Sequence, residues 1–205
     1  MDNNRSKEYE TYFNYLNRIS PRGRIYKRFF VSPILFLCAR HFGSRIIEVG
    51  SGTGSGVLGA FSRSVVGLDI NPFAVKFCNS KGWRASVIEE NGRFPLPSDS
   101  TDVCILDNVL EHIEQPRRVF DECYRVTGDQ GGLVIVVPGV RGYDSDSDHK
   151  IFYNEDRLKE VDERWRCVRS FSTPFLFKSL ALSQSIKQYC LVAVYKKVGL
   201  GSLIQ

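Results

Sequence analysis

The chain has 205 residues, of which 42% are hydrophobic and 25% are charged, and its formal net charge is +5. These values suit a globular domain with a full hydrophobic core, and no apolar run reaches the roughly 18 residues that a membrane-spanning helix needs. The six cysteines contain no Cys-x-x-Cys pair and no histidines at zinc spacing, so we expect a reducing, cytoplasmic environment, no disulfide framework and no structural zinc.

The N-terminal part of the chain is predicted to be helical. Apolar residues recur at helical spacing over 7–19 and again over 25–42, where Gly43 provides a C-cap, and Pro21 and Gly23 separate the two helices. Five basic residues fall in the same stretch: Arg18, Arg22, Arg24, Lys27 and Arg28. They indicate a solvated helix face or, alternatively, a weak contact with phosphate or a membrane surface.

From residue 44 onward, short β-rich runs alternate with helical runs. Strands are predicted over 45–49, 64–70, 85–88, 103–106 and 133–137, and helices over 57–61, 72–80 and 116–126. This alternation predicts a parallel sheet covered by helices on both faces. We therefore divide the chain into an N-terminal helical cap, residues 1–43, and an α/β domain, residues 44–205, which together form one compact unit.

A glycine-rich turn follows the first predicted strand, with the sequence EVGSGTGSG over residues 48–56. In an open α/β sheet this turn is the usual ligand contact. The turn lacks the Gly-Lys-Ser/Thr of a P-loop, and it lacks the third glycine of the dinucleotide fingerprint. Its acidic residue, Glu48, suits a ligand that carries positive charge better than one that carries pyrophosphate.

An acidic residue, Asp69, ends the second predicted strand. A carboxylate at this place can accept hydrogen bonds from the 2′ and 3′ hydroxyls of a ribose. The alternative is that Asp69 caps the following helix. Asn71 suits that role better, because Asn71 directly precedes Pro72 at the helix start.

Four segments, in this order, resemble the motifs of the class I S-adenosylmethionine-dependent methyltransferases: IIEVGSGTGSG, VVGLDINPFAV, FPLPSDSTDVCILDNVLEHI and VFDECYRVTGDQGGLVIVVPG. The similarity runs from about residue 46 to residue 139 and is greatest to the small-molecule branch with LPF-like and vLEHi-like motifs. It implies a Rossmann-like, seven-stranded, mostly parallel sheet with helices on both faces and an antiparallel last strand. The runs over 166–171 and 189–195 are typical of the two further strands.

The same resemblance implies S-adenosylmethionine as the cofactor. The residues that it places at the cofactor are Glu48, Gly50, Ser51, Gly52, Gly54, Asp69, Ile70, Glu90, Asn91, Asp107 and Asn108. The glycines would line the methionine and ribose, Glu48 would face the amino group and Asp69 would hold the ribose. Glu90 aligns with the acid that accepts from the adenine N6 amino group; its neighbour Glu89 is the alternative if the alignment shifts by one residue.

Two histidines are candidate general bases. His112 lies in the vLEHi-like segment, where a structural role at a helix start is the alternative. His149 follows the fifth strand and, with Tyr143 and Asp148, forms a candidate base cluster, or else is a solvated loop residue. The acidic residues around it partly match a calcium-binding loop, but His149 stands where that loop needs glycine. We therefore expect a flexible acidic lid and no metal site; the alternatives are calcium binding and the weaker divalent-metal binding of an O-methyltransferase.

The sequence predicts a methyltransferase that acts on a small molecule, at oxygen, in natural-product or sugar chemistry. No Asp/Asn-Pro-Pro-aromatic segment ends the fourth strand, so base amines are not expected as acceptors and no nucleic-acid partner is predicted. The N-terminal tyrosines and the segment 174–186 are expected to shape the acceptor pocket. The alternatives are a non-catalytic methyltransferase-like binding subunit and, after it, an NAD-dependent oxidoreductase.

Overall fold

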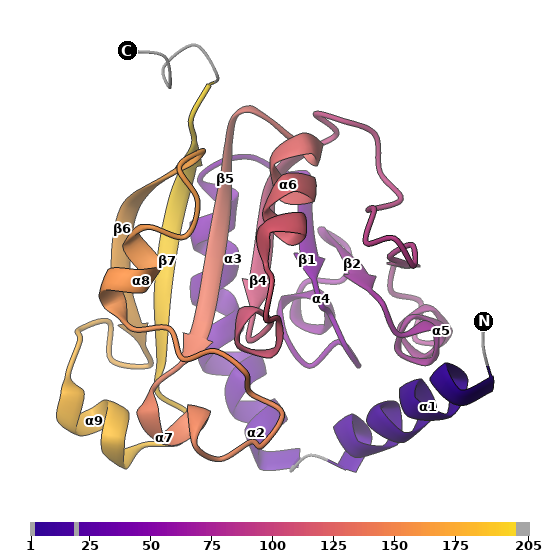
Figure 1. The fold of residues 1–205 in the computed structure, drawn as a ribbon, viewed down its shortest axis with the longest axis horizontal. Coiled ribbons are helices and arrows are strands. Elements are labelled where there is room, and N and C mark those ends of the chain that lie inside the picture. Colours follow the sequence, from indigo (N-terminus) through magenta and orange to yellow (C-terminus); the bar gives the residue numbers. More distant parts are fainter. Residues whose placement is uncertain (1–2, 19–20, 200–205) are drawn as a thin grey trace.

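A seven-stranded sheet forms the centre of the computed structural model, which describes residues 3–18 and 21–199 (Figure 1). Its strands, in the spatial order β3-β2-β1-β4-β5-β7-β6, are β1 (Ile46–Val49), β2 (Val65–Asp69), β3 (Ala85–Val87), β4 (Thr101–Asp107), β5 (Thr127–Pro138), β6 (Trp165–Thr173) and β7 (Cys190–Lys197). All neighbouring strands are parallel except that β7 runs antiparallel to both β5 and β6. The predicted Rossmann-like sheet with an antiparallel last strand is confirmed.

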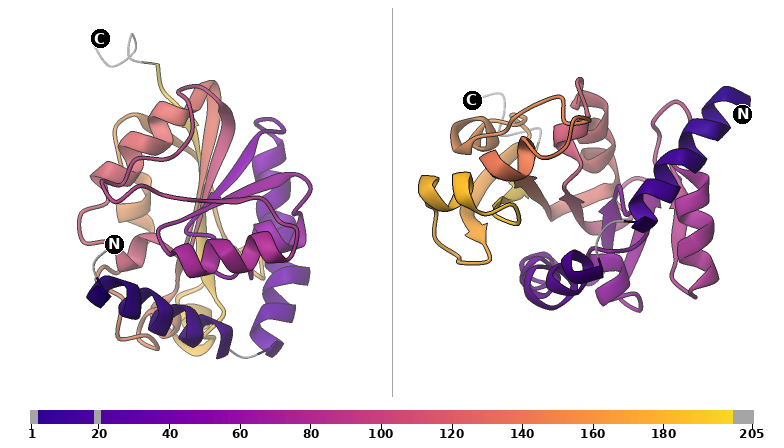
Figure 2. Two further views of the ribbon diagram at one scale, coloured as in Figure 1. Left: turned by 90° about the vertical axis from the view of Figure 1, so that its right-hand side faces the viewer. Right: turned by 90° about the horizontal axis from the view of Figure 1, so that it is seen from below.

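Helices cover both faces of the sheet (Figure 1 and Figure 2). One face carries α2 (Pro21–Tyr26), the π-helical turn η1 (Lys27–Val31), α3 (Ser32–Arg40), α4 (Val57–Ala60) and α5 (Pro72–Ser80). The opposite face carries the 3₁₀ turn η2 (Leu110–His112), α6 (Arg117–Val126) and α8 (Glu155–Lys159). The remaining helices are α7 (Val140–Tyr143), α9 (Leu180–Ser185), which packs on α7, and α1 (Asn3–Arg18), which lies against α5. Within the described residues, no helix is long and apolar enough to cross a membrane.

The two central strands are buried on both faces, and their side chains alternate between two cores. Ile47 and Val49 of β1 belong to the core under α6, whereas Ile46 belongs to the core under α3. Glu48 therefore projects toward the α3 side, because successive strand side chains point to opposite faces. Asp107 of β4 projects to that same side, since it is two residues beyond Ile105 of the α3-side core.

The helical stretch predicted over 25–42 is observed, but it begins at Pro21, ends at Arg40 and contains a π turn. It consists of α2, the π turn and α3, and the amide of Ser32 donates to the carbonyl of Lys27, five residues earlier. The reason lies in two prolines. Pro21 begins α2, and Pro33 has no amide hydrogen to donate four residues back, so the helical hydrogen bonding shifts register before α3. The predicted helix over 7–19 is observed as α1 as far as Arg18; residue 19 lies outside the described residues.

The fifth strand is much longer than the 133–137 that the sequence predicts. It begins at Thr127 and pairs with Thr101 of β4. The added residues include three glycines, which disfavour a strand, so tertiary pairing overrides local propensity here. Gly132 is needed for packing, because a Cβ atom there would lie 2.5 Å from the ring of Phe42. The division of the chain at residue 43 stays a prediction. Leu35 of α3 lies in the predicted N-terminal cap and is fully buried in the core beside the sheet.

Asp102 at the start of β4 fixes the start of β1. Its carboxylate accepts hydrogen bonds from the amides of Ser44, at 2.8 Å, and Arg45, at 2.9 Å. The guanidinium of Arg45 donates to it as well, at 2.6 and 2.9 Å. Partial burial opposes ionisation, but the Arg45 hydrogen bonds outweigh it and lower the pKa of Asp102.

We predict that Asp102→Ala lowers the free energy of unfolding by about 1–3 kcal/mol, because it leaves two amides and a guanidinium without their acceptor. Urea denaturation followed by circular dichroism measures the change. The matched control is Asp156→Ala, whose carboxylate pairs with Lys159 at the surface and should change stability by less than about 0.5 kcal/mol. Equal losses in the two variants would contradict the role of Asp102.

Candidate functional site

A cavity of about 740 Å³ opens at the carboxyl ends of the strands. It lies between β1 and β4, where the strand order reverses, which is where open α/β sheets bind ligands. Its lining comes from the turn after β1, the ends of β2 and β4, η2 and helix α1. The volume falls within the range of small-molecule sites.

The glycine-rich turn forms one wall of this cavity. Gly50, Gly52 and Gly54 all have positive φ angles, of 70°, 51° and 69°, a conformation that glycine adopts at little cost. Gly52 presents bare backbone, and a Cβ there would meet only Leu16 of α1, at 3.5 Å. Gly54 does not line the cavity; instead, it makes room for Trp83, whose ring would lie 2.3 Å from a Cβ at this position.

Asp69 lies at the floor of the cavity, where it is only 7% exposed. One carboxylate oxygen accepts from the amide of Gly52 at 2.7 Å, and the other accepts from the amide of Asn71 at 2.8 Å. Burial raises the pKa of Asp69, against the effect of these two hydrogen bonds. The predicted cap is confirmed, since the Asn71 side chain accepts from the amides of Phe73 and Ala74 at the start of α5.

Glu48, the acidic residue before the glycines, caps helix α4. Its carboxylate accepts from the amides of Val57, at 3.1 Å, and Leu58, at 2.6 Å, while it also lines the cavity. Burial, together with the neighbouring Asp107, raises the pKa of Glu48 to about 7, against the hydrogen bonds from the α4 amides and the charge of Lys27. The first strand thus delivers a carboxylate that the α4 amides hold at the site.

Lys27 is a site residue that sequence reasoning missed. Its ammonium comes from the π turn η1 and forms an ion pair of 3.1 Å with Asp107 in the cavity. Burial opposes its charge, but Asp107 and Glu48 outweigh that effect and raise the pKa of Lys27. Of the basic cluster, Lys27 and Arg24 therefore line the cavity, while Arg28 is exposed. The side chains of Arg18 and Arg22 lie outside the described part of the chain.

Helix α1 covers part of the cavity. Tyr9 and Tyr12 line it, as expected for the N-terminal tyrosines, whereas Tyr15 does not. The carbonyl of Tyr9 accepts from the side-chain amide of Asn71 at 2.8 Å, which ties α1 to the end of β2. Burial, with nearby acidic residues, raises the pKa of Tyr12 to about 12. The segment 174–186, which was expected to shape the pocket, does not line this cavity.

The loop after β3 contributes to the cavity through residues other than those predicted. Glu90 and Asn91 are exposed and do not line it. The lining residues of this loop are Ile88, Gly92 and Phe94. Asn91 instead closes the loop, because its side chain accepts from the amide of Arg93 at 2.7 Å.

Three other predicted residues do line the cavity. Ile70 is 55% exposed at the cavity, directly after Asp69. Asn108 follows Asp107 with a positive φ of 56°, and its side-chain amide donates to the Asp107 carboxylate at 3.0 Å. Ser51 also contributes to the lining.

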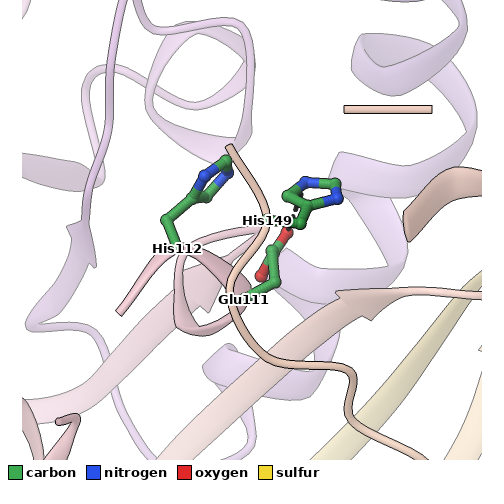
Figure 3. A group of neighbouring side chains, drawn as sticks. All are labelled: Glu111, His112 and His149. Carbon is green, nitrogen blue, oxygen red and sulfur yellow. Dashed lines mark ion pairs between the residues drawn. The ribbon is translucent and has the colours of Figure 1, made fainter. Parts of the chain in front are cut away.

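A buried carboxylate, Glu111, lies next to the predicted histidines (Figure 3). It is 1% exposed, and neither of its oxygens has a hydrogen-bond partner among the described residues. Burial raises the pKa of Glu111 to about 8. The backbone carbonyl of Glu111 accepts from the amides of Lys150, at 2.6 Å, and Ile151, at 3.1 Å, so the loop expected to be a free lid is joined to η2.

The structure brings the two histidines together, with ring centroids 4.7 Å apart. Nδ1 of His149 lies 2.8 Å from the carbonyl oxygen of Tyr143, and its Nε2 lies 4.0 Å from Glu111. Nδ1 of His112 lies 3.0 Å from Asp148. The predicted base cluster is therefore arranged differently, because Asp148 contacts His112 and Tyr143 stacks on His149.

Comparison with known proteins agrees with this architecture. Residues 47–135 match the family described as "Methyltransferase domain". A probable S-adenosylmethionine-dependent methyltransferase of Mycobacterium tuberculosis is 32% identical over 96 residues, which cover 45% of this chain and 35% of the relative. A probable S-adenosylmethionine-dependent methyltransferase of Mycolicibacterium smegmatis is 30% identical over 105 residues, which cover 50% of this chain and 41% of that relative.

Solved structures share the fold over most of the chain. A SAM-dependent methyltransferase from Aquifex aeolicus superposes with a TM-score of 0.63 at 18% identity, covering 92% of this chain and 98% of that one. One from Archaeoglobus fulgidus gives a TM-score of 0.61 at 21% identity, covering 83% and 94%. Residues 47–135 therefore match a methyltransferase domain, and the chain is similar in sequence to proteins named S-adenosylmethionine-dependent methyltransferases. S-adenosylmethionine is the cofactor that this similarity implies.

The packing of Gly54 against Trp83 gives a prediction about the glycine turn. Gly54→Ala should lower the free energy of unfolding by more than Gly82→Ala, because both positions have positive φ but only Gly54 is crowded. We expect about 1 kcal/mol for Gly82→Ala from backbone strain alone. For Gly54→Ala we expect a further loss of about 1–3 kcal/mol in the free energy of unfolding, because the new methyl group would overlap the Trp83 ring.

Urea unfolding of the two variants measures this difference. The double variant Gly54→Ala/Trp83→Ala should be less destabilised than the sum of its single changes, because removing the ring removes the clash. Equal losses at the two glycines, or simple additivity with Trp83→Ala, would show that the ring does not constrain the turn.

Proposed function

We propose that this chain is an S-adenosylmethionine-dependent methyltransferase that acts on a small molecule, at oxygen. The observation that carries the proposal is the cavity at the β1/β4 junction, in which a buried Asp69 and bare glycine backbone face the same space. A nucleoside requires both features: a carboxylate for the ribose hydroxyls and a wall that the ligand can approach closely. The methyl acceptor would occupy the remaining space.

The ribose would lie on Asp69. Each of its carboxylate oxygens accepts one backbone amide and retains further acceptor capacity for a ribose hydroxyl. Gly50, Ser51 and Gly52 would border the ribose and the methionine part. The adenine would pack between Ile70 and the loop after β3. The adenine roles predicted for Glu90 and Asn91 stay predictions.

The methionine part of the cofactor carries an ammonium, a carboxylate and a sulfonium. The site holds the carboxylates of Glu48 and Asp107 but only the ammonium of Lys27 beside them. When both acids are ionised, this group has a net negative charge and favours the binding of a second cation. The cofactor ammonium would lie between the two acids. Lys27 would turn to the cofactor carboxylate.

Methyl transfer is an in-line displacement. A lone pair of the acceptor oxygen attacks the methyl carbon, the carbon–sulfur bond breaks, and the sulfonium becomes a neutral thioether. Holding donor and acceptor in line supplies much of the rate acceleration. The hydroxyl proton must also leave, and His112, which lines the cavity, and His149 behind it are the candidate bases.

The cofactor proposal predicts that the folded protein binds S-adenosylmethionine and S-adenosylhomocysteine but not NAD in calorimetric titrations. Asp69→Ala should weaken both by at least about tenfold, or 1.4 kcal/mol, because the ribose hydroxyls lose their acceptor. Asp69→Asn should weaken them less, since the amide oxygen still accepts. A folded Asp69→Ala protein with unchanged affinity would contradict the ribose assignment, and a folded wild type that binds neither ligand would contradict the cofactor proposal.

A second prediction concerns pH. Because the pKa of Glu48 is about 7, only about a tenth of it is ionised at pH 6 and about nine tenths at pH 8. A cationic ligand favours the ionised form, so the Kd of S-adenosylmethionine should fall by up to about tenfold from pH 6 to pH 8. Glu48→Gln should remove this dependence while keeping an acceptor for one of the two α4 amides. The same slope in wild type and variant would contradict the assignment.

The acceptor class is tested with labelled S-adenosylmethionine and a panel of phenols, catechols, sugars and amines. Transfer to hydroxyl compounds is expected. Transfer to amines alone would contradict the oxygen assignment. Cofactor binding without transfer to any of them would favour a non-catalytic methyltransferase-like binding subunit.

A further inference from the structure

Glu111, His112 and His149 form a group of donors beside the cavity, and the methyl transfer proposed above gives no role to Glu111 (Figure 3). Each residue offers one ligand atom, and these atoms all lie within 4.8 Å of one another. Glu111 is buried, and neither of its carboxylate oxygens has a hydrogen-bond partner among the described residues, although one lies 4.0 Å from Nε2 of His149. A carboxylate without hydrogen bonds is costly in a protein interior. We infer that these three residues bind a divalent transition-metal ion.

The hydrogen bonds of both histidines support this assignment. The Tyr143 carbonyl can only accept, so Nδ1 of His149 carries the proton and its Nε2 carries the free lone pair. An ionised Asp148 carboxylate can likewise only accept, so Nδ1 of His112 donates to it and carries the proton. A histidine that donates one ring N–H to a carbonyl or carboxylate, and keeps the other nitrogen free, is the arrangement typical of metal ligands.

The donor atoms are close enough for one ion to draw them together. Metal–nitrogen and metal–oxygen bonds of about 2.0–2.2 Å place two ligand atoms of a tetrahedral site about 3.3–3.6 Å apart. Nε2 of His149 and the nearer oxygen of Glu111 are 4.0 Å apart. Closing this separation and the others, which reach 4.8 Å, needs movements of about 1 Å toward the ion. The loop that carries His149 is already held against η2 by the amides of Lys150 and Ile151.

The ligand set indicates the class of metal. Two imidazoles and one carboxylate favour Zn²⁺, Mn²⁺, Fe²⁺ or Co²⁺ over Mg²⁺ and Ca²⁺, which prefer all-oxygen sites. Three protein ligands leave coordination positions open. His112 lines the proposed cofactor cavity, so an open position would face the acceptor. On the proposed function, the metal would hold the acceptor oxygen and favour its ionised form.

The test uses tag-free, chelator-treated protein and metal alone, so it does not depend on the cofactor or on activity. Titration with Co²⁺, followed by visible absorption, should show one site whose spectrum lacks the strong near-ultraviolet band of thiolate ligands. Competition with Zn²⁺ should bleach that spectrum. Glu111→Gln and His149→Ala should each weaken binding by more than about a hundredfold, and Asp148→Asn by about 10–100-fold.

The chain offers matched controls. His41 is its only histidine outside this group, and Glu114 is an exposed acid three residues from Glu111. His41→Ala and Glu114→Gln should leave Co²⁺ binding unchanged, and circular dichroism confirms that each variant is folded. Absence of a single site in the folded wild type, or a site that survives both Glu111→Gln and His149→Ala, would overturn the inference. Cofactor binding in the metal-free protein is measured separately, so failure of the metal site and failure of the proposed function are distinguishable.

Discussion

The ion pair between Lys27 and Asp107 is the interaction on which the candidate site depends. Asp107 and Glu48 lie on the same face of two adjacent central strands, and both are buried. A buried charge costs several kcal/mol unless it is paired and hydrogen-bonded. Lys27 supplies the counter-charge for Asp107, and the α4 amides satisfy Glu48. The N-terminal helices are therefore electrostatically part of the site, although they precede the sheet in sequence.

The same cost supports the proposed cofactor role of the two acids. A methyl donor with a sulfonium and an ammonium is attracted to carboxylates, and a low-dielectric surrounding strengthens that attraction. Apolar residues of equal size would pack as well and would avoid the desolvation cost. We interpret the charged group as a stability cost that the ligand offsets when it binds.

Helix α1 connects this electrostatic centre to the mouth of the cavity. It is held by the hydrogen bond from Asn71 to the Tyr9 carbonyl and by the contact of Phe13 with Phe77, whose ring centroids are 5.7 Å apart. Asn71 also caps α5 and donates its amide to Asp69. One residue thus links the covering helix and α5 through its side chain and the proposed ribose ligand, Asp69, through its backbone amide. Ligand entry and the docking of α1 therefore involve neighbouring contacts.

The sequence alone determined the features that depend on local pattern. Alternating β and helical runs predicted the sheet, the glycine run predicted the close-approach turn, and Asn71 before Pro72 predicted the cap, because each signal lies within a few consecutive residues. Tertiary structure decided the rest. Lys27 and Asp107, which form an ion pair, are 80 residues apart in the sequence, and His149 and Glu111 are 38 residues apart. Such pairs depend on how helices and loops pack on the sheet, and local periodicity carries no information about which distant side chain arrives at a given atom.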